Sequence, residues 1–201
     1  MLRPNVRGIA ALLLFLLTGC ATPGKVNTDI WHSLTPEQRG EADVLETVLA
    51  KLGARCLAEN PGQPCTPPKV LLTWAGTQPQ YARVTHTILI PAWALKSETR
   101  PTMAHEIGHA WWADARDDCG TPEKLILCEY NANHHAIFVL MVGYGYDERT
   151  AIRMRWSVLV WSVASAVKPS PGHPDACAEL HAFERRLGIR EYACTERVSK
   201  R

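Results

Sequence analysis

Residues 103–112 constrain this chain more than any other stretch, because they place two histidines four positions apart in a run that favours helix. Pro101 suits the first turn of a helix, and the run contains no helix breaker except Gly108. Residues four apart lie on the same face of a helix, one turn from each other, so the imidazoles of His105 and His109 can bind one metal ion. The sequence therefore predicts a metal-binding helix.

Glu106 projects about 100° round this helix from His105. Its carboxylate is then close enough to reach a water molecule on the metal and take a proton from it, which is the H-E-x-x-H arrangement of zinc peptidases. Glu106 is therefore the candidate catalytic residue. The alternative is a buried helix whose histidines are merely hydrogen-bonded. The small residues Gly108 and Ala104 also let another helix approach this one closely.

A third ligand has to come from elsewhere in the chain, because a catalytic zinc site takes three ligands from the protein and keeps the fourth position for water. Glu129 follows His109 by 20 residues, which is enough for the first helix to end and for a second helix to return to the metal. Asn133 lies four residues later on the same helical face, where it can hold the free ring nitrogen of a ligating histidine.

The pentapeptide His-Glu-Ile-Gly-His at 105–109, followed by Glu129 and Asn133, resembles the gluzincin group of metallopeptidases. The segment of about residues 84–142 is most similar to small ImmA/IrrE-like and related minimal gluzincins. This resemblance implies an α+β zincin-like domain with a small sheet, a metal helix, a glutamate-bearing second helix and further helices behind. It also implies one Zn²⁺ per chain, held by the two histidines and Glu129, with Glu106 as the general base of peptide-bond hydrolysis. Asn133 stands where aspartate is frequent in that group.

The N-terminus has the composition of an export signal, in which two arginines precede an apolar run. Leu-Thr-Gly-Cys at 17–20 resembles a bacterial lipoprotein processing site. That resemblance implies a signal peptide at residues 1–19, lipidation of Cys20, and a flexible tether at 20–30 that anchors the mature chain to a membrane. The expected location is the cell envelope, at the outer membrane and facing the periplasm. The alternative is a plain secretory signal that is cut elsewhere.

Residues 31–201 are expected to form one domain, since the chain beyond the signal is long enough for a real core. Once the two arginines of the signal are removed, basic and acidic residues are equal in number. Bulk charge therefore gives no reason to expect nucleic acid as a partner. The expected partners are a peptide or protein substrate and, through the lipid anchor, a membrane.

Apart from Cys20, six cysteines remain, an even number that suits a compartment in which disulfides persist. They fall along the sequence as three neighbouring pairs, and closing the middle pair would fix the link that delivers Glu129 to the metal. Such a loop closure contributes about 3 kcal/mol. A second metal site made from the middle pair is the alternative. The expected disulfides are Cys56–Cys65, Cys119–Cys128 and Cys177–Cys194.

Hydrophobic periodicity and turn signals place the other elements. The second half of one expected helix, residues 156–167, is apolar nearly all round, which implies burial on most sides, either in this domain or against a partner or membrane. Strands are expected at residues 70–74 and 84–90, and helices from about Pro36, from Thr121 to about 142, over 147–167 and over 175–187.

Three further residues are candidates for contact with a substrate. Tyr144 and Tyr146 are flanked by glycine and could donate a hydrogen bond to a tetrahedral oxyanion, although such a stretch is more often a turn with packed aromatics. His173 lies in a loop from which the chain could return to the metal, like the assisting histidine of some zinc peptidases. The sequence thus favours a zinc metallopeptidase. Two alternatives stay open: a zinc-stabilised envelope lipoprotein that binds a partner without turnover, and a lipid-anchored structural module with an accidental motif.

Overall fold

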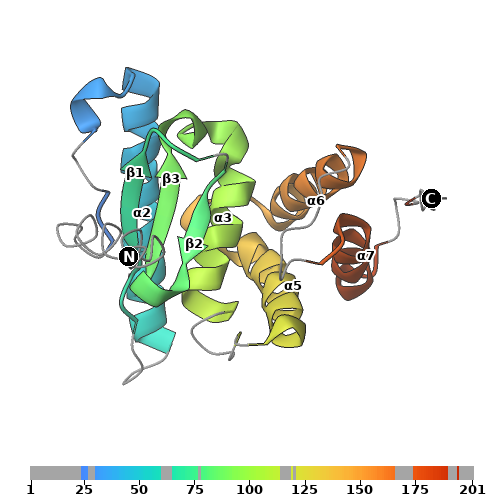
Figure 1. The fold of residues 1–201 in the computed structure, drawn as a ribbon. Helices are drawn as coiled ribbons and strands as arrows, with labels where there is room; N and C mark the ends of the chain where they lie inside the picture. Colours follow the sequence, from blue (N-terminus) through green and yellow to red (C-terminus); the bar gives the residue numbers. More distant parts are fainter. Residues whose placement is uncertain are drawn as a thin grey trace, which may run out of the picture. The chain divides into compact units, whose positions relative to one another are not determined.

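The computed structural model describes residues 24–26, 30–59, 65–76, 78–113, 119, 121–165, 174–189 and 194, and Figure 1 shows its elements. The described residues form a mixed α+β structure of five helices and one three-stranded sheet, as the sequence predicted. They group into two compact units, one up to Lys96 and the other from Ser97. The described helices include none that combines the length and the apolar character needed to cross a bilayer. The expected signal peptide, Cys20 and His173 lie outside the described residues.

Helix α2, Pro36–Glu59, belongs to the first unit and starts where its sequence provides a reciprocal cap. The Oγ1 atom of Thr35 accepts a hydrogen bond from the backbone N–H of Gln38 at 3.2 Å, and Oε1 of Gln38 accepts one from the backbone N–H of Thr35 at 2.8 Å. Apolar side chains recur along one face at helical spacing and are buried. These core residues are Leu45, Val48, Leu49 and Leu52.

The sheet of the first unit has the strand order β1-β3-β2. Its central strand, β3 (Thr87–Pro91), pairs in parallel with β1 (Lys69–Thr73) and antiparallel with β2 (Gln80–Ala82). The apolar side chains of Ile88 and Ile90 on β3 are completely buried. A central strand of β-branched residues fits this position, because both of its edges are paired.

The strand predicted at 70–74 is confirmed, but the one predicted at 84–90 is wrong in its first half. Residues Arg83–Thr85 form a 3-10 turn, and His86 has a left-handed backbone with φ of 47°. The ring of His86 makes this conformation favourable by two contacts. Its Nδ1 lies 2.9 Å from the hydroxyl of Tyr81, and its Nε2 lies 3.0 Å from the carbonyl oxygen of Thr66.

Part of the expected tether, residues 24–26, is held against the first unit. The backbone N–H of Gly24 donates to the carbonyl of Pro68 at 3.0 Å, and that of Val26 donates to Oε1 of Glu46 at 2.9 Å. Val26 also forms a parallel bridge with Val70, and its side chain is buried. This piece of chain is therefore folded rather than a free linker.

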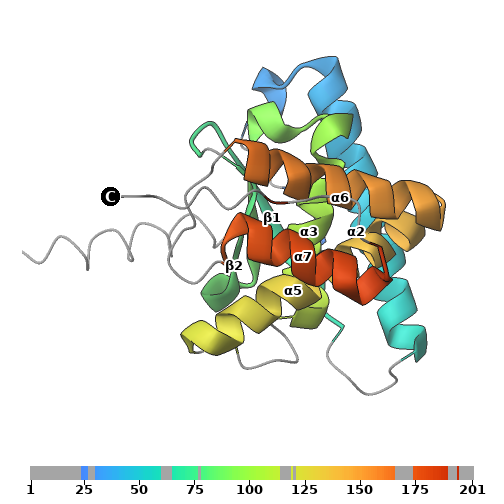
Figure 2. The same ribbon diagram turned by 90° about the vertical axis from the view of Figure 1, so that its right-hand side faces the viewer.

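The second unit is helical. Its helices are α3 (Arg100–Gly108), α5 (Pro122–Phe138), α6 (Glu148–Ala164) and α7 (Ala176–Leu187), with π-helical turns at His109–Ala113 and Val139–Gly143. Thr121 caps α5, as predicted, by accepting from the backbone N–H of Lys124 at 3.4 Å, and Asp147 and Asp175 cap α6 and α7. Figures 1 and 2 show α7 beside α6 and α5.

Helices α3 and α5 approach each other closely at Gly108. A Cβ atom added to Gly108 would lie 2.8 Å from the carbonyl oxygen of Ala132 and 3.3 Å from Cβ of His135, both on α5. The absence of a side chain therefore lets the backbones meet, which confirms the role expected for this glycine. Ala104, one turn earlier on α3, is fully buried.

The three predicted disulfides are confirmed. Cys119 and Cys128 are both fully buried and form a small apolar cluster with Ala132, against which Leu125 packs. Since Cys128 immediately precedes Glu129 on α5, this cluster fixes the first half of that helix. The bonded pairs are Cys56–Cys65, Cys119–Cys128 and Cys177–Cys194.

Gly108→Ala should lower the free energy of unfolding by about 1–3 kcal/mol, because the added methyl group meets the backbone of α5. Gly40→Ala is the matched control, since a Cβ at this position in α2 meets nothing within 4 Å. It should instead raise the free energy of unfolding by about 0.5–1 kcal/mol. Urea denaturation followed by circular dichroism compares the two variants. Equal effects would contradict the close approach.

Candidate metal centre

Three side chains that could hold a metal ion meet between α3 and α5. The Nε2 atoms of His105 and His109 are 3.1 Å apart, and Oε2 of Glu129 lies 3.1 Å from the first and 3.3 Å from the second. All three residues are buried, with 6–7% of their surface exposed. The structure therefore brings together the three ligands that the sequence predicted.

The spacing of these three atoms fits a tetrahedral metal ion. At metal–ligand bonds of about 2.0–2.1 Å, two ligands of such an ion lie about 3.3–3.4 Å apart. The observed separations of 3.1–3.3 Å differ from this by a few tenths of an ångström. Two imidazole nitrogens and one carboxylate oxygen are also donors that divalent metals accept. The group can thus bind a metal with little movement.

The local fold of α3 explains how the two histidines converge. They are four residues apart, with ring centroids 4.6 Å apart and ring planes at 85°. The helix passes into a π-helical turn that begins at His109 itself. Gly108 lies just before this turn and brings α5 close enough for Glu129 to reach both rings.

Glu106 directly follows His105 on α3 and is half-buried. The Glu106 carboxylate interacts electrostatically with Arg155, a buried residue of α6. Burial lowers the pKa of the Arg155 guanidinium, and the carboxylates of Glu179, Glu106 and Glu129 oppose this by favouring its charged form. The four charged side chains therefore form one electrostatic cluster.

Arg155 is the functional residue that sequence reasoning missed. Its Nη2 donates to Nδ1 of His105 at 3.1 Å, and its Nε donates to Oδ1 of Asn133 at 2.6 Å. Glu179 of α7 lies 3.7 Å from the same Nη2 and accepts a hydrogen bond of 2.5 Å from Nδ2 of Asn133. Arg155 thus links the metal helix to α5, α6 and α7.

This network corrects the role expected for Asn133. In the described part of the chain its side chain bonds to Arg155 and Glu179, not directly to a ligating histidine. Asn133 therefore acts on His105 through Arg155. Because a guanidinium has donors only, Nδ1 of His105 accepts, and the neutral ring carries its hydrogen on Nε2, towards Glu129. Metal binding at Nε2 requires this hydrogen either to move to Nδ1, which would end the hydrogen bond from Arg155, or to leave as a proton, which would make the ring an imidazolate.

The environment keeps the His105 ring neutral. Burial is the main reason that its pKa falls to about 3, the charge of Arg155 lowers it further, and the hydrogen bond with Glu129 partly opposes the shift. The contact of His105 with Glu129 is therefore a hydrogen bond from an uncharged ring. A neutral imidazole is also the form that binds a metal.

The two tyrosines proposed for substrate contact gather round Arg100 at the start of α3. Nη1 of Arg100 donates to the hydroxyl of Tyr146 at 2.8 Å, and its guanidinium lies 5.5 Å from the ring centroid of Tyr144. The two tyrosine rings are 6.4 Å apart. This is a packed cation–aromatic cluster, and contact with a substrate stays a prediction.

Arg155→Met should lower the free energy of unfolding by about 3–5 kcal/mol, because it leaves Glu179 and Asn133 without their buried cationic partner. Arg153→Met is the matched control: the same change on the same helix at an exposed position. It should shift the free energy of unfolding by no more than about 0.5 kcal/mol. Denaturation curves recorded without metal measure both. An Arg155 variant as stable as the control would contradict the network.

No protein-family model matches this chain, and neither the curated proteins nor the solved structures provide a significant match. The chemistry of the centre therefore depends on its own residues. Their donor atoms, burial and charges support a site able to bind a metal ion.

Proposed function

We propose that this chain is a zinc-dependent metallopeptidase with a zincin-like fold, similar to the gluzincins. His105, His109 and Glu129 would bind one Zn²⁺ per chain, and Glu106 would be the general base. The observation that carries the proposal is the convergence of three buried donor atoms within 3.3 Å of one another, with Glu106 directly after the first ligand. Two imidazoles and one carboxylate form a donor set that catalytic zinc sites use.

The charges round the centre also favour a divalent cation. Glu129, Glu106 and Glu179 all act electrostatically on Arg155, so three carboxylates lie close enough to influence one buried guanidinium. A divalent cation bound to His105, His109 and Glu129 would favour the ionised forms of these carboxylates.

Zinc bound at this centre would polarise a peptide carbonyl and lower the pKa of its water ligand to about 7. Glu106 would accept a proton from that water and later pass it to the leaving amine. Its place next to His105 on α3 keeps it beside the ligands. Arg155 holds the far side of the His105 ring, and Asn133 and Glu179 hold Arg155 in turn.

The proposed substrate is a peptide or protein of the bacterial cell envelope. Three disulfides suit an oxidising compartment. The lipoprotein-like sequence at Cys20 favours an anchor in the outer membrane, with the domain facing the periplasm.

A second candidate function is a zinc-stabilised envelope lipoprotein that binds a partner without turnover. One observation favours it: the centre and the Arg155 network together connect α3, α5, α6 and α7. A metal bound there would also stabilise the packing of these four helices. The two functions differ in whether Glu106 takes part in a reaction.

Metal content tests the third ligand. Purified wild-type protein should hold about one zinc per chain, and Glu129→Ala should lose most of it, because two histidines alone bind zinc weakly. Glu123→Ala removes an exposed carboxylate from the same helix and should keep the metal. Elemental analysis after gel filtration measures all three proteins. Unchanged zinc in the Glu129 variant would exclude this residue as a ligand.

Activity tests the general base. Glu106→Gln should keep its zinc and lose hydrolysis of a responsive substrate from a broad peptide panel by at least about 100-fold, because the amide cannot accept the proton. Glu98→Gln, an exposed residue just before α3, is the control and should retain activity. Full activity in the Glu106 variant would refute its role. Zinc without turnover in the wild type, with a lower melting temperature after chelation, would instead favour the partner-binding protein.

A further inference from the structure

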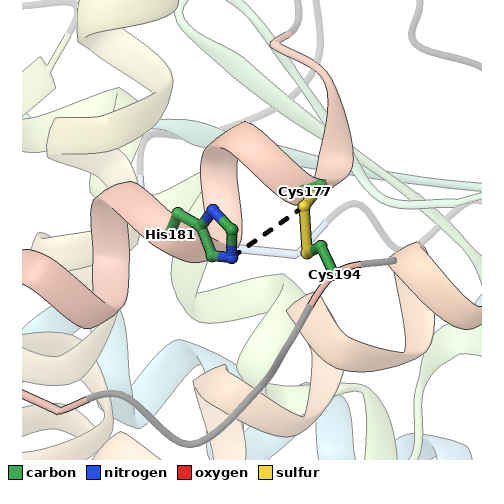
Figure 3. Close-up of side chains that lie close together, drawn as sticks. All are labelled: Cys177, His181 and Cys194. Atoms are coloured by element: carbon green, nitrogen blue, oxygen red, sulfur yellow. Dashed lines mark hydrogen bonds between the residues drawn. A yellow bond between two sulfur atoms is a disulfide. The ribbon is translucent and has the colours of Figure 1, made fainter. Parts of the chain in front are cut away.

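A second group of donor side chains lies on α7 and the segment that follows it. Cys177 and His181 belong to this helix, and Cys194 follows it in sequence (Figure 3). One ligand atom from each residue lies within 4.8 Å of the other two, and Nε2 of His181 is 4.0 Å from Sγ of Cys177. All three residues are half-buried. A solvent molecule or ion can therefore reach them more easily than the fully buried Cys119 and Cys128.

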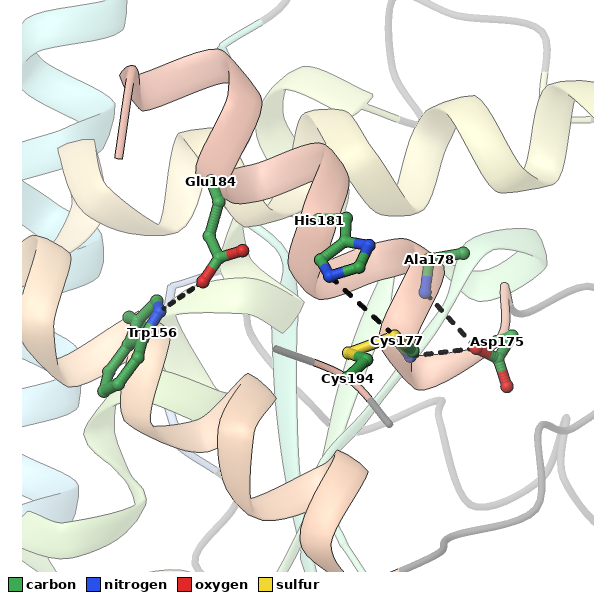
Figure 4. Close-up of a disulfide and its surroundings, with 7 residues drawn as sticks. All are labelled: Trp156, Asp175, Cys177, Ala178, His181, Glu184 and Cys194. Atoms are coloured by element: carbon green, nitrogen blue, oxygen red, sulfur yellow. Dashed lines mark hydrogen bonds between the residues drawn. A yellow bond between two sulfur atoms is a disulfide. The ribbon is translucent and has the colours of Figure 1, made fainter. Parts of the chain in front are cut away.

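The helix holds two of these donors in place. Cys177 and His181 are four residues apart, so they share one face of α7, and Figure 4 shows the imidazole directed at the sulfur. Asp175 caps the helix by accepting from the backbone N–H groups of Cys177 and Ala178, at 3.0 and 3.3 Å. At the other end, Glu184 accepts from the indole N–H of Trp156 on α6 at 3.0 Å.

In the oxidised protein the two sulfurs are bonded to each other and are not available to a metal. A dithiol reductant would break this bond: the dithiol is oxidised to its own disulfide, and Cys177 and Cys194 each gain one electron and one proton. The resulting Cys177 thiol lies beside His181 in the first turn of α7, where the positive end of the helix dipole favours its thiolate form. Reduction would thus release two soft ligands beside an imidazole.

We propose that reduction of the Cys177–Cys194 disulfide creates a zinc site made of two thiolates and the imidazole of His181. A sulfur and a nitrogen bound to one tetrahedral zinc lie about 3.6 Å apart. The observed 4.0 Å between Sγ of Cys177 and Nε2 of His181 needs only a small adjustment. Zinc binding would release the remaining thiol protons and join Cys194 to α7 again, in place of the disulfide. The same sulfurs would then hold either a disulfide or a metal.

This site is independent of the centre formed by His105, His109 and Glu129, which contains no cysteine. The experiment therefore compares the same full-length chain before and after reduction, with Zn²⁺ alone as the probe. Reduced wild-type protein should bind one zinc more per chain than oxidised protein. His181→Ala should weaken the additional zinc by at least about tenfold, since even the loss of a residue that only supports a ligand costs that much. His32→Ala, an exposed histidine of the first unit, is the matched control.

The double variant Cys177→Ser/Cys194→Ser distinguishes zinc binding at this site from zinc binding by the other four thiols that reduction produces. In the reduced state this variant should not take up the additional zinc; uptake equal to that of the wild type would overturn the proposal. Alkylation mapped by peptide mass spectrometry gives a second, site-resolved measurement. Zinc should slow alkylation of Cys177 and Cys194 in reduced wild-type protein but not in His181→Ala. Equal alkylation rates with and without zinc would also refute the site.

Discussion

The approach of α3 to α5 at Gly108 is the contact on which the metal centre depends. His105 belongs to α3, His109 begins the π-helical turn that continues α3, and Glu129 belongs to α5. The distance between these backbones therefore sets whether the three donor atoms can meet. With the Cβ position of Gly108 only 2.8 Å from a carbonyl oxygen, the helices are as close as a residue without a side chain permits. The buried disulfide Cys119–Cys128 adds a covalent bond at the residue just before Glu129, inside a small apolar cluster with Ala132. These local features thus position His105 and Glu129, which are 24 residues apart in the sequence.

Much of this centre could be predicted because its signals are local. The four-residue spacing of His105 and His109 acts through helix geometry alone, and the cap at Thr121 acts within one turn. Arg155 could not be assigned in this way, because its partners come from three other helices. A signal was nevertheless present: Arg155 stands between Ala151 and Leu159, four residues from each, in the buried stripe of α6. An arginine in such a stripe requires a buried partner, although the sequence does not say which one.

The sheet shows where pattern reasoning fails for a different reason. Residues 84–90 alternate as a strand does, yet the first three leave the sheet because the side chain of His86 bonds to Tyr81 and to the carbonyl of Thr66. Side-chain contacts between separate segments overrode the local preference. The short strand Gln80–Ala82 lacked enough residues to produce a periodic signal, and it was recognisable only through its pairing with β3.

The number of donors bears on whether a metal at this centre stabilises the fold or takes part in a reaction. Structural zinc sites fill four positions with protein groups, whereas catalytic sites use three and leave one for water. In the part of the chain that the structure describes, His105, His109 and Glu129 form a group of three, with no fourth histidine, cysteine or carboxylate in it. Arg155 occupies the opposite side of the His105 ring, where it holds the ring without competing for a ligand position. A metal held by these three donors alone would keep a fourth position for water, which is the arrangement that hydrolysis requires.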